Sequence, residues 1–443
     1  MKINMPAYVK EVIEKIEKAG FEAFAVGGCV RDFVMGKTPS DWDITTSARP
    51  DDILKIFNDF KTVTSGISHG TVAVITNHTA VEITTYRKDG IYSDNRHPDS
   101  VIFTNSLSED LSRRDFTMNA LAYSKKSGII DKFAGISDIE NMTVRCVGNP
   151  DKRFFEDALR IIRALRFASV LSFNLEEETH QSARRNRNLL LNIAPERILS
   201  EFKKLLLGDY VEKILHEYKD IIAVFLPEIV PTFDFDQRNN HHIYDAWGHI
   251  VKGIAVSPKL VYVRLAMLFH DIAKPQCLKF DSRGFGHFKG HPALGEKIAV
   301  DCLKRLHCDK KTIKIVAFLI RYHDTPLPAD KVEIKKWLSR YGVALMRLLF
   351  EVKIADNLAK NRSFPQRLIE AKEGRAILRT IIKNDECFSL DRLAVCGDDL
   401  INAGFPPGQR LGIILHALLD AVIEEKCKNE KPALLALAES HRV

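Results

Sequence analysis

Two aspartates that stand two residues apart, Asp41 and Asp43, carry the clearest chemical signal in this sequence. The segment around them is predicted to be a strand, in which alternate side chains point to the same face. Both carboxylates then face one spot, while Trp42 faces the other side. Two like charges held this close repel each other unless a cation lies between them, and hard oxygen ligands favour Mg²⁺. The pair therefore predicts a Mg²⁺ site, although a solvated strand end gives the same pattern.

A pair of glycines, Gly27 and Gly28, precedes the aspartates and follows an apolar run at residues 21–26. Glycine allows the backbone to approach a phosphate closely, and the helix start that follows offers unpaired N–H groups to it. Metal-binding carboxylates beside such a phosphate cradle indicate phosphoryl or nucleotidyl transfer.

A second set of candidate metal ligands lies in the C-terminal half of the sequence. Imidazoles together with carboxylates are good ligands for a transition metal. A single histidine on an apolar helix is more often a core residue, but this set has six members in the order H, HD, H, H, D. They are His249, His270, Asp271, His291, His323 and Asp356.

The elements that must position the first site follow from the spacing of apolar residues. Residues 7–19 and 51–60 have the spacing of amphipathic helices. Residues 71–76 and 81–86 are predicted to be the two strands of a hairpin. Glu82 lies on the second strand, where it is either a third carboxylate of the metal site or an outward-facing strand residue.

Three further segments follow. Residues 87–101 are rich in Asp, Gly, Asn and Pro, which predicts a mobile loop. Residues 111–121 begin as a helix and carry a cluster of charges. Residues 155–167 are predicted to form one helix, on which Asp157 and Arg160 share a face because they are three residues apart.

Composition limits the class of protein. The chain has 443 residues, enough for two to four domains, and a formal charge of +7, which is consistent with a polyanionic partner. No apolar run is long enough to span a membrane, and the first residues lack the apolar core of a signal peptide. The eight cysteines form no C-x-x-C pair, as expected of reduced thiols in a cytoplasmic protein. The oligomeric state does not follow from the sequence.

Several motifs together resemble the signature of the DNA polymerase β-like nucleotidyltransferases, in the class II branch of CCA-adding tRNA nucleotidyltransferases and bacterial poly(A) polymerases. They are GG-x-VRD at residues 27–32, D-W-D at 41–43, RRDFT-x-NA at 113–120, ED-x-x-R at 156–160 and R-x-x-RF at 163–167. The resemblance covers nearly the whole chain and implies an α+β fold. It implies a nucleotidyltransferase head of mixed sheet and helices at residues 1–148, a helical neck with the nucleotide-selecting motif at 149–208, an HD-type helical body at 209–385 and a helical tRNA-binding tail at 386–443.

The resemblance also implies a role for each motif residue. Asp41, Asp43 and Glu82 would be catalytic and hold Mg²⁺. The nucleotide-binding residues would be Gly27, Gly28, Arg31 and Arg114 at the phosphates, Asp115 at the ribose, Asp157 with Arg160 at the base, and Arg163 with Arg166 at the triphosphate or in support of that pair. Simple ion pairs remain the alternative for Arg31 with Asp32 and for the charges around Arg114.

Cytosine and adenine both present an amino donor next to a ring-nitrogen acceptor, whereas uracil and guanine present a carbonyl and a protonated nitrogen. A carboxylate with a guanidinium can therefore accept C and A and reject U and G. Each mispaired buried group would cost roughly 1–3 kcal/mol.

The histidine pattern resembles the HD superfamily of metal-dependent phosphohydrolases. If active, this body would use its metal to cleave phosphomonoesters or cyclic phosphodiesters, with phosphate-bearing RNA 3′ ends as a sensible substrate. A domain of this kind can also persist as a scaffold.

The expected activity is template-independent addition of C, C and A to the tRNA 3′ end from CTP and ATP, with release of pyrophosphate. The predicted loop at 87–101 resembles the family's element for adding A, and so it also fits an enzyme that adds only A and works with a CC-adding partner. A phosphohydrolase that uses only the HD body, and a non-catalytic RNA-binding protein, are weaker alternatives because Asp41 and Asp43 are both present.

Overall fold

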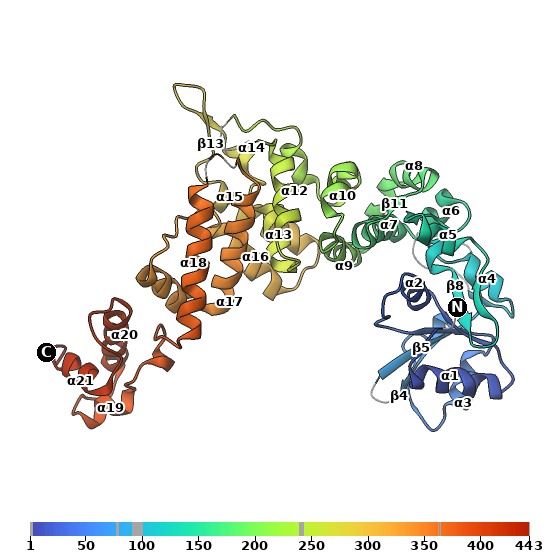
Figure 1. The fold of residues 1–443 in the computed structure, drawn as a ribbon, viewed down its shortest axis with the longest axis horizontal. Coiled ribbons are helices and arrows are strands. Elements are labelled where there is room, and N and C mark those ends of the chain that lie inside the picture. Colours follow the sequence, from blue (N-terminus) through green and yellow to red (C-terminus); the bar gives the residue numbers. More distant parts are fainter. Residues whose placement is uncertain are drawn as a thin grey trace. The chain divides into compact units, whose positions relative to one another are not determined.

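The computed structural model describes residues 3–76, 79–90, 101–238, 243–361, 363 and 365–442. These residues form two compact units, Met1–Pro227 and Glu228–Val443, and each unit is described by itself. The first unit opens with a mixed β-sheet and its helices, and helices make up most of the remaining chain (Figure 1). The predicted α+β class with a helical C-terminal part is confirmed.

A seven-stranded sheet in the order β3-β4-β5-β2-β1-β8-β9 forms the framework of the first unit. Among the described strands of this sheet, only β2 and β5 pair in parallel; the other pairings are antiparallel. The strands are β1 Ala23–Val26, β2 Asp43–Thr46, β3 Lys61–Val63, β4 Thr71–Thr76, β5 Thr79–Thr85, β8 Leu121–Ser124 and β9 Gly128–Asp131. The hairpin strands β4 and β5 fall where the alternation predicts them.

Short helices accompany the sheet: α1 Ala7–Lys18, α2 Gly28–Val34, α3 Pro50–Ile56, α4 Leu107–Ser112 and α5 Gly135–Glu140. In α1 the predicted apolar positions Val9, Val12, Ile13 and Ile16 are all buried. Helix α3 begins with a proline, which suits the first helical position because its missing N–H has no partner there. Figure 1 shows α1 and α3 next to each other beside β4.

The predicted loop at 87–101 begins and ends as paired strand. β6, Arg87–Asp89, pairs antiparallel with β7, Val101–Phe103. Residues 91–100 lie outside the described residues, so the predicted mobility of the loop is not tested.

Two predicted helices are wrong in extent. The helix expected at 111–121 is the end of α4 followed by a short 3₁₀ turn, Thr117–Asn119. The helix expected at 155–167 is two helices, α6 Pro150–Glu156 and α7 Leu159–Leu171. In each case an aspartate side chain takes a nearby backbone N–H: Asp115 that of Phe116, and Asp157 that of Leu159. Such local bonds compete with the helical ladder, and periodicity does not reveal them.

The rest of the first unit is helical apart from two short strands that pair in parallel, β10 Thr143–Val144 and β11 Asn174–Leu175. After α7 come α8 Glu177–Arg185, α9 Pro195–Leu206, α10 Val211–Glu217 and α11 Lys219–Phe225. Helix α9 packs on α7 through its buried face, which includes Leu199, Phe202 and Leu206.

The second unit is a group of helices: α12 Ala246–Val256, α13 Val261–Phe269, α14 Lys274–Cys277, α15 His291–Arg305, α16 Lys310–Tyr322, α17 Lys331–Leu358 and α18 Gln366–Lys383. A two-stranded ribbon, β12 Lys279–Phe280 with β13 Gly286–His287, precedes α15. Helices α17 and α18 lie side by side (Figure 1). None of the helices in the described part of the chain is both long and apolar enough to cross a membrane.

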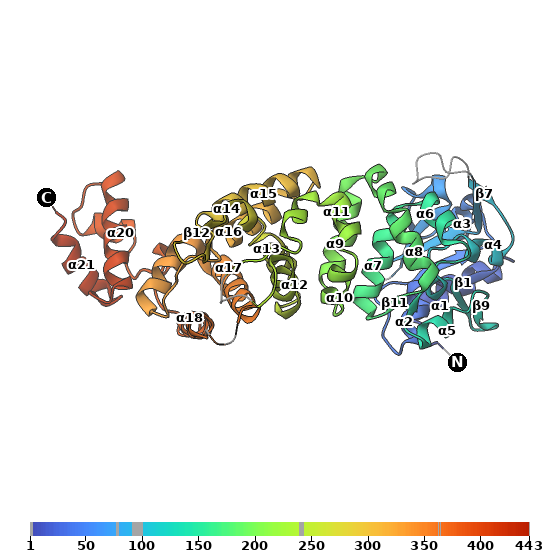
Figure 2. The ribbon, with the colours of Figure 1, turned by 90° about the horizontal axis from the view of Figure 1, so that it is seen from above.

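Three helices complete the second unit: α19 Gly397–Asn402, α20 Gln409–Ile423 and α21 Lys431–Glu439. Figure 2 shows α20 and α21, in red, against each other. They share a core of their own that includes Leu400, Leu418 and Leu434.

Candidate functional site

Three carboxylates gather where β2 begins. Asp43 is the first residue of β2, and Glu82 is its register neighbour on the parallel strand β5. The strand predicted to carry both aspartates begins only at Asp43: Asp41 precedes it and accepts a hydrogen bond from Ser40 at 3.0 Å, and Trp42 is buried.

The electrostatics of Asp43 reflect this gathering. Removal from water raises its pKa, and repulsion from Glu82 and Asp41 raises it further, against the opposing effect of Arg114. An all-carboxylate donor set under mutual repulsion fits a hard divalent cation.

Gly27 lies against this site in a conformation that glycine adopts readily, with φ of 80°. A Cβ on Gly27 would also come within 3.1 Å of Arg114 Nη1. Arg114 is held in turn by Asp110, at 3.4 Å from Nη2 to Oδ2. Asp110 is fully buried, accepts from Thr45 and pairs with Arg113 at 2.7 Å. Arg113 and Arg114 lie three and four residues after Asp110, a spacing visible in the sequence, whereas the burial of Asp110 and its bond from Thr45 depend on the fold.

Arg31 forms the ion pair that was the alternative to a phosphate contact. Its guanidinium bonds Asp32 Oδ1 at 2.6 and 2.9 Å and Asn119 Oδ1 at 2.7 Å. These bonds hold the Arg31 guanidinium against Asp32 and Asn119.

Three guanidiniums surround the ring of Phe167 on α7. Arg166, Arg31 and Arg163 lie 3.7, 5.1 and 5.6 Å from its centroid. Glu201 on α9, which sequence reasoning missed, pairs with Arg166 at 2.7 Å and lies 3.9 Å from Arg163. Burial lowers the pKa of Arg166 to about 10, against the effect of Glu201.

Asp115 is engaged by Arg163, at 2.6 Å from Oδ2, and its other oxygen accepts from Asn119 and from the Phe116 N–H. Burial alone would raise the pKa of Asp115, but the Arg163 guanidinium outweighs burial and holds it well below its usual range. Asp115 therefore stays ionised and holds Arg163 of α7 in an ion pair.

Asp157 and Arg160, the predicted base-selecting pair, are held by different partners. Arg160 is 8% exposed and donates to Glu156 at 2.8 Å and to the carbonyls of Arg153 and Arg113. Asp157 lies in the break between α6 and α7, with Oδ2 3.5 Å from Arg197.

All six predicted ligands of the second unit come together and are buried. His249 Nε2 lies 3.1 Å from each of His270 Nε2, Asp271 Oδ2 and Asp356 Oδ1. His291 Nε2 lies 3.2 Å from both His323 Nε2 and Asp271 Oδ1. His270 and His323 sit at the C-terminal ends of α13 and α16, and His291 begins α15. Burial alone would lower the pKa of His270, but the two carboxylates raise it to about 9.

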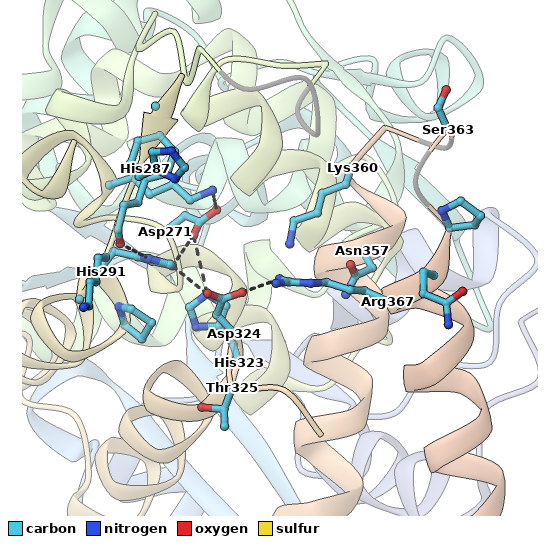
Figure 3. A pocket seen from close by; sticks show the side chains of 18 residues that line it. Asp271, His287, His291, His323, Asp324, Thr325, Asn357, Lys360, Ser363 and Arg367 are labelled. Carbon is cyan, nitrogen blue, oxygen red and sulfur yellow. Dashed lines mark hydrogen bonds and ion pairs between the residues drawn. The ribbon is translucent and has the colours of Figure 1, made fainter. Parts of the chain in front are cut away.

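A cavity of about 970 Å³ opens beside these residues. Asp271, His291 and His323 lie on one side of it, and Lys360 and Arg367 point toward them from the other side (Figure 3). The cationic residues of this wall were missed from the sequence, because Lys and Arg are common on any helix surface.

Three segments of the chain match family models. Residues 23–145 match the poly A polymerase head domain, residues 172–231 the probable RNA and SrmB-binding site of polymerase A, and residues 293–438 the tRNA nucleotidyltransferase domain 2.

Similar proteins cover nearly the whole length of the chain. The chain is 35% identical to the CCA-adding enzyme of Pediococcus pentosaceus over 432 residues and 34% identical to that of Levilactobacillus brevis over 429 residues, with 96% of each chain covered in both cases. Among solved structures it resembles the Bacillus stearothermophilus CCA-adding enzyme in complex with CTP, with a TM-score of 0.70, 28% identity and coverage of 99% of this chain and 98% of that chain.

Proposed function

The chain belongs to the family of CCA-adding enzymes, and we propose that it adds C, C and A to the 3′ end of tRNA, using CTP and ATP and releasing pyrophosphate. The similarity to two curated CCA-adding enzymes over nearly their whole length carries this proposal. The likeness to an enzyme solved with CTP supports the choice of nucleotide.

In this reaction the tRNA 3′-oxygen attacks the α-phosphorus of the incoming nucleotide, and the bond to pyrophosphate breaks. We assign Asp41, Asp43 and Glu82 to two Mg²⁺ ions, in keeping with the raised pKa of Asp43 and the all-oxygen donor set. Such ions, when bound, lower the pKa of the attacking hydroxyl and neutralise charge on the triphosphate. No side chain is needed as a general base.

We assign the phosphates to Arg114 and to the backbone at Gly27 and Gly28. Arg31 is braced by Asp32 and Asn119, and it reaches a phosphate only by sharing its guanidinium with them. Likewise, Asp115 can accept from a ribose hydroxyl only while it holds Arg163.

Asp157 and Arg160 remain our choice for base selection, with Arg163 and Arg166 at the triphosphate. Asp157 supplies acceptor oxygens for the amino group of C or A, and Arg160 supplies donors for the ring nitrogen. Glu156 neutralises and orients Arg160.

The test of the main proposal is incorporation of labelled CTP or ATP, with Mg²⁺, into tRNA that ends before C, after CC or after CCA. Uptake of CTP on the shortest tRNA supports it. Uptake of ATP alone, on the CC-ended tRNA, would identify an enzyme that adds only A.

The same proposal includes the division of the chain into four parts at residues 148, 208 and 385. It also includes a cytoplasmic location, which is in keeping with eight free cysteines.

The buried histidine cluster favours a second function, metal-dependent hydrolysis of a phosphate ester in an HD-type body. In this reaction water attacks phosphorus, the ester P–O bond breaks, and the proton lost by water passes to the leaving oxygen. RNA with a 3′ phosphate is the substrate to test, by phosphate release. Asp41→Ala should abolish nucleotide incorporation and leave phosphate release unchanged.

A further inference from the structure

We propose that Phe167 is a positioning residue for nucleotide binding. Its ring holds the guanidiniums of Arg31, Arg163 and Arg166 together and leaves N–H donors of each for the triphosphate of CTP or ATP. The inference rests on the proposed nucleotide addition and deepens it, because it gives a role to a residue that has no polar side-chain atom.

The cations around Phe167 come from two separate elements of the first unit. Arg163 and Arg166 lie on α7 with Phe167 itself, whereas Arg31 lies on α2. Their guanidinium carbons are all within 6 Å of the ring centroid, a distance at which the negative face of an aromatic ring attracts a cation. Phe167 is only 5% exposed, and loss of water strengthens such an attraction.

Three like charges around one ring repel each other. Each guanidinium has a carboxylate partner at 2.6–2.7 Å, and the pairs are Arg31 with Asp32, Arg163 with Asp115 and Arg166 with Glu201. Burial lowers the pKa of Arg166 to about 10; Glu201 opposes this effect, and the charges of Arg163 and Arg31 add to it. The ring therefore contacts a cation that its surroundings destabilise.

Arg166 depends on the ring more than the other two arginines do. Arg31 and Arg163 are held by hydrogen bonds to side-chain oxygens. The contact between Arg166 Nε and Glu201 Oε2 lacks hydrogen-bond geometry, and both atoms are buried without a hydrogen bond to any described residue. Stacking on Phe167 at 3.7 Å is therefore the contact that orients this guanidinium.

An aromatic ring stabilises a guanidinium without using its N–H groups. The ring is attracted to the face of the guanidinium, whereas the N–H donors lie in its plane. Arg31 makes three hydrogen bonds to described residues and Arg163 makes two, fewer than the donors that each side chain carries. A phosphate accepts from such donors. An additional carboxylate could replace the ring only by occupying them.

The three arginines lie beside residues that we assign to the nucleotide. A Cβ on Gly28, in the proposed phosphate cradle, would come within 3.7 Å of Arg31 Nη2. Against the effect of burial, Asp115 raises the pKa of Arg163, and the proposed base-selecting Asp157 contributes to the rise. The cluster thus extends from the phosphate cradle toward the base-selecting residue.

A neighbouring ring separates cation contact from simple packing. Phe116 meets Phe167 edge to face, with centroids 5.6 Å apart and planes at 80°. Phe116 is fully buried, and no cation of the described residues lies over its ring. A change that acts through packing should therefore affect both rings, and a change that acts through cations should affect Phe167 alone.

The test changes the charge distribution of the ring and keeps its shape. Full-length protein is made with phenylalanine that carries one, two or three ring fluorines at position 167, because fluorine weakens the negative face of the ring. Binding of CTP and of ATP, with Mg²⁺, is measured by calorimetry. We expect Kd to rise stepwise with each fluorine, to about tenfold for three, and by the same factor for both nucleotides because they share the triphosphate.

The matched control places the same fluorinated residues at position 116, where we expect Kd to change by less than about twofold. A second measurement uses Phe167→Leu, which keeps an apolar side chain and should raise Kd about tenfold. In the background of Arg166→Gln the same change should raise Kd by less than about threefold, because much of its effect passes through Arg166. Circular dichroism checks that each variant is folded.

The outcomes separate this inference from the proposed function. Equal weakening at positions 167 and 116, no trend at position 167, or different factors for CTP and ATP would overturn the inference. A chain that shows the trend but adds no labelled nucleotide to tRNA would overturn the proposed function and keep the inference. Absence of CTP and ATP binding in the unchanged chain would overturn both.

Discussion

The two candidate metal sites hold their ligands in opposite ways. In the first unit Asp41, Asp43 and Glu82 are exposed carboxylates at the start of a strand and on its neighbour. In the second unit the ligands are buried imidazoles and carboxylates at helix ends. Exposed oxygens suit a hard ion that arrives and leaves with a nucleotide, and buried nitrogens suit a transition metal that stays.

The largest expected effect tests whether the sites are independent. Asp43→Ala should lower nucleotide incorporation by about a thousandfold, because a catalytic metal supplies several kcal/mol and each 1.4 kcal/mol is tenfold in rate. Metal content of the second unit should not change. Asp59→Ala, an exposed aspartate paired with Lys15, serves as the control, and joint loss of both properties in Asp43→Ala would contradict the comparison.

The next effect concerns stability. Asp110→Ala should reduce the free energy of unfolding of the first unit by about 3 kcal/mol, since it removes a fully buried carboxylate and leaves Arg113 and Arg114 without it. Hydrogen exchange measured by mass spectrometry can follow each unit separately. Protection should fall in the first unit only; Asp59→Ala should change it by less than about 0.5 kcal/mol.

A smaller effect tests the arginines around Phe167. Glu201→Gln should raise the KM for CTP roughly tenfold, because Arg166 and Arg163 lose the charge that they share, and a partly buried ion pair of this kind contributes about 1.5 kcal/mol. Steady-state kinetics measure this. Glu178→Gln, on an exposed pair with Arg185, should leave KM unchanged; a similar rise there would argue against a positioning role.

The smallest effect follows from the raised pKa of Asp43. An acid whose pKa is raised by folding destabilises the metal-free fold at neutral pH, and this penalty disappears as the pH falls below the ordinary value of 3.8. Asp43→Asn should therefore raise the Tm of the metal-free protein by about 1–3 °C at pH 7 and not at pH 3.5. Thermal unfolding at both pH values measures this; equal shifts at the two would contradict it.

The sequence predicted most of what spacing can encode. The hairpin strands, the amphipathic helix α1 and the order of the six histidine-site residues all follow local patterns. It did not predict that Asp115 and Asp157 interrupt helices, because a side chain that bonds a nearby N–H leaves the apolar period unchanged.

Residues that act through distant partners were also missed. Glu201 is an ordinary acid in the sequence and becomes important only where the fold brings Arg166 to it. Lys360 and Arg367 can be identified as candidate site residues only from the cavity that they line. Tertiary contact, rather than spacing, determines these roles.

Each of the four histidine rings of the second unit places its Nδ1 at 2.7–3.3 Å from a backbone carbonyl oxygen. This contact has a consequence for how an ion is captured. Each ring is oriented before binding, so little side-chain rotation is lost when an ion enters. Capture should then be limited by dehydration of the ion and by its passage through the protein. The metal-free and loaded forms should have nearly the same ring positions.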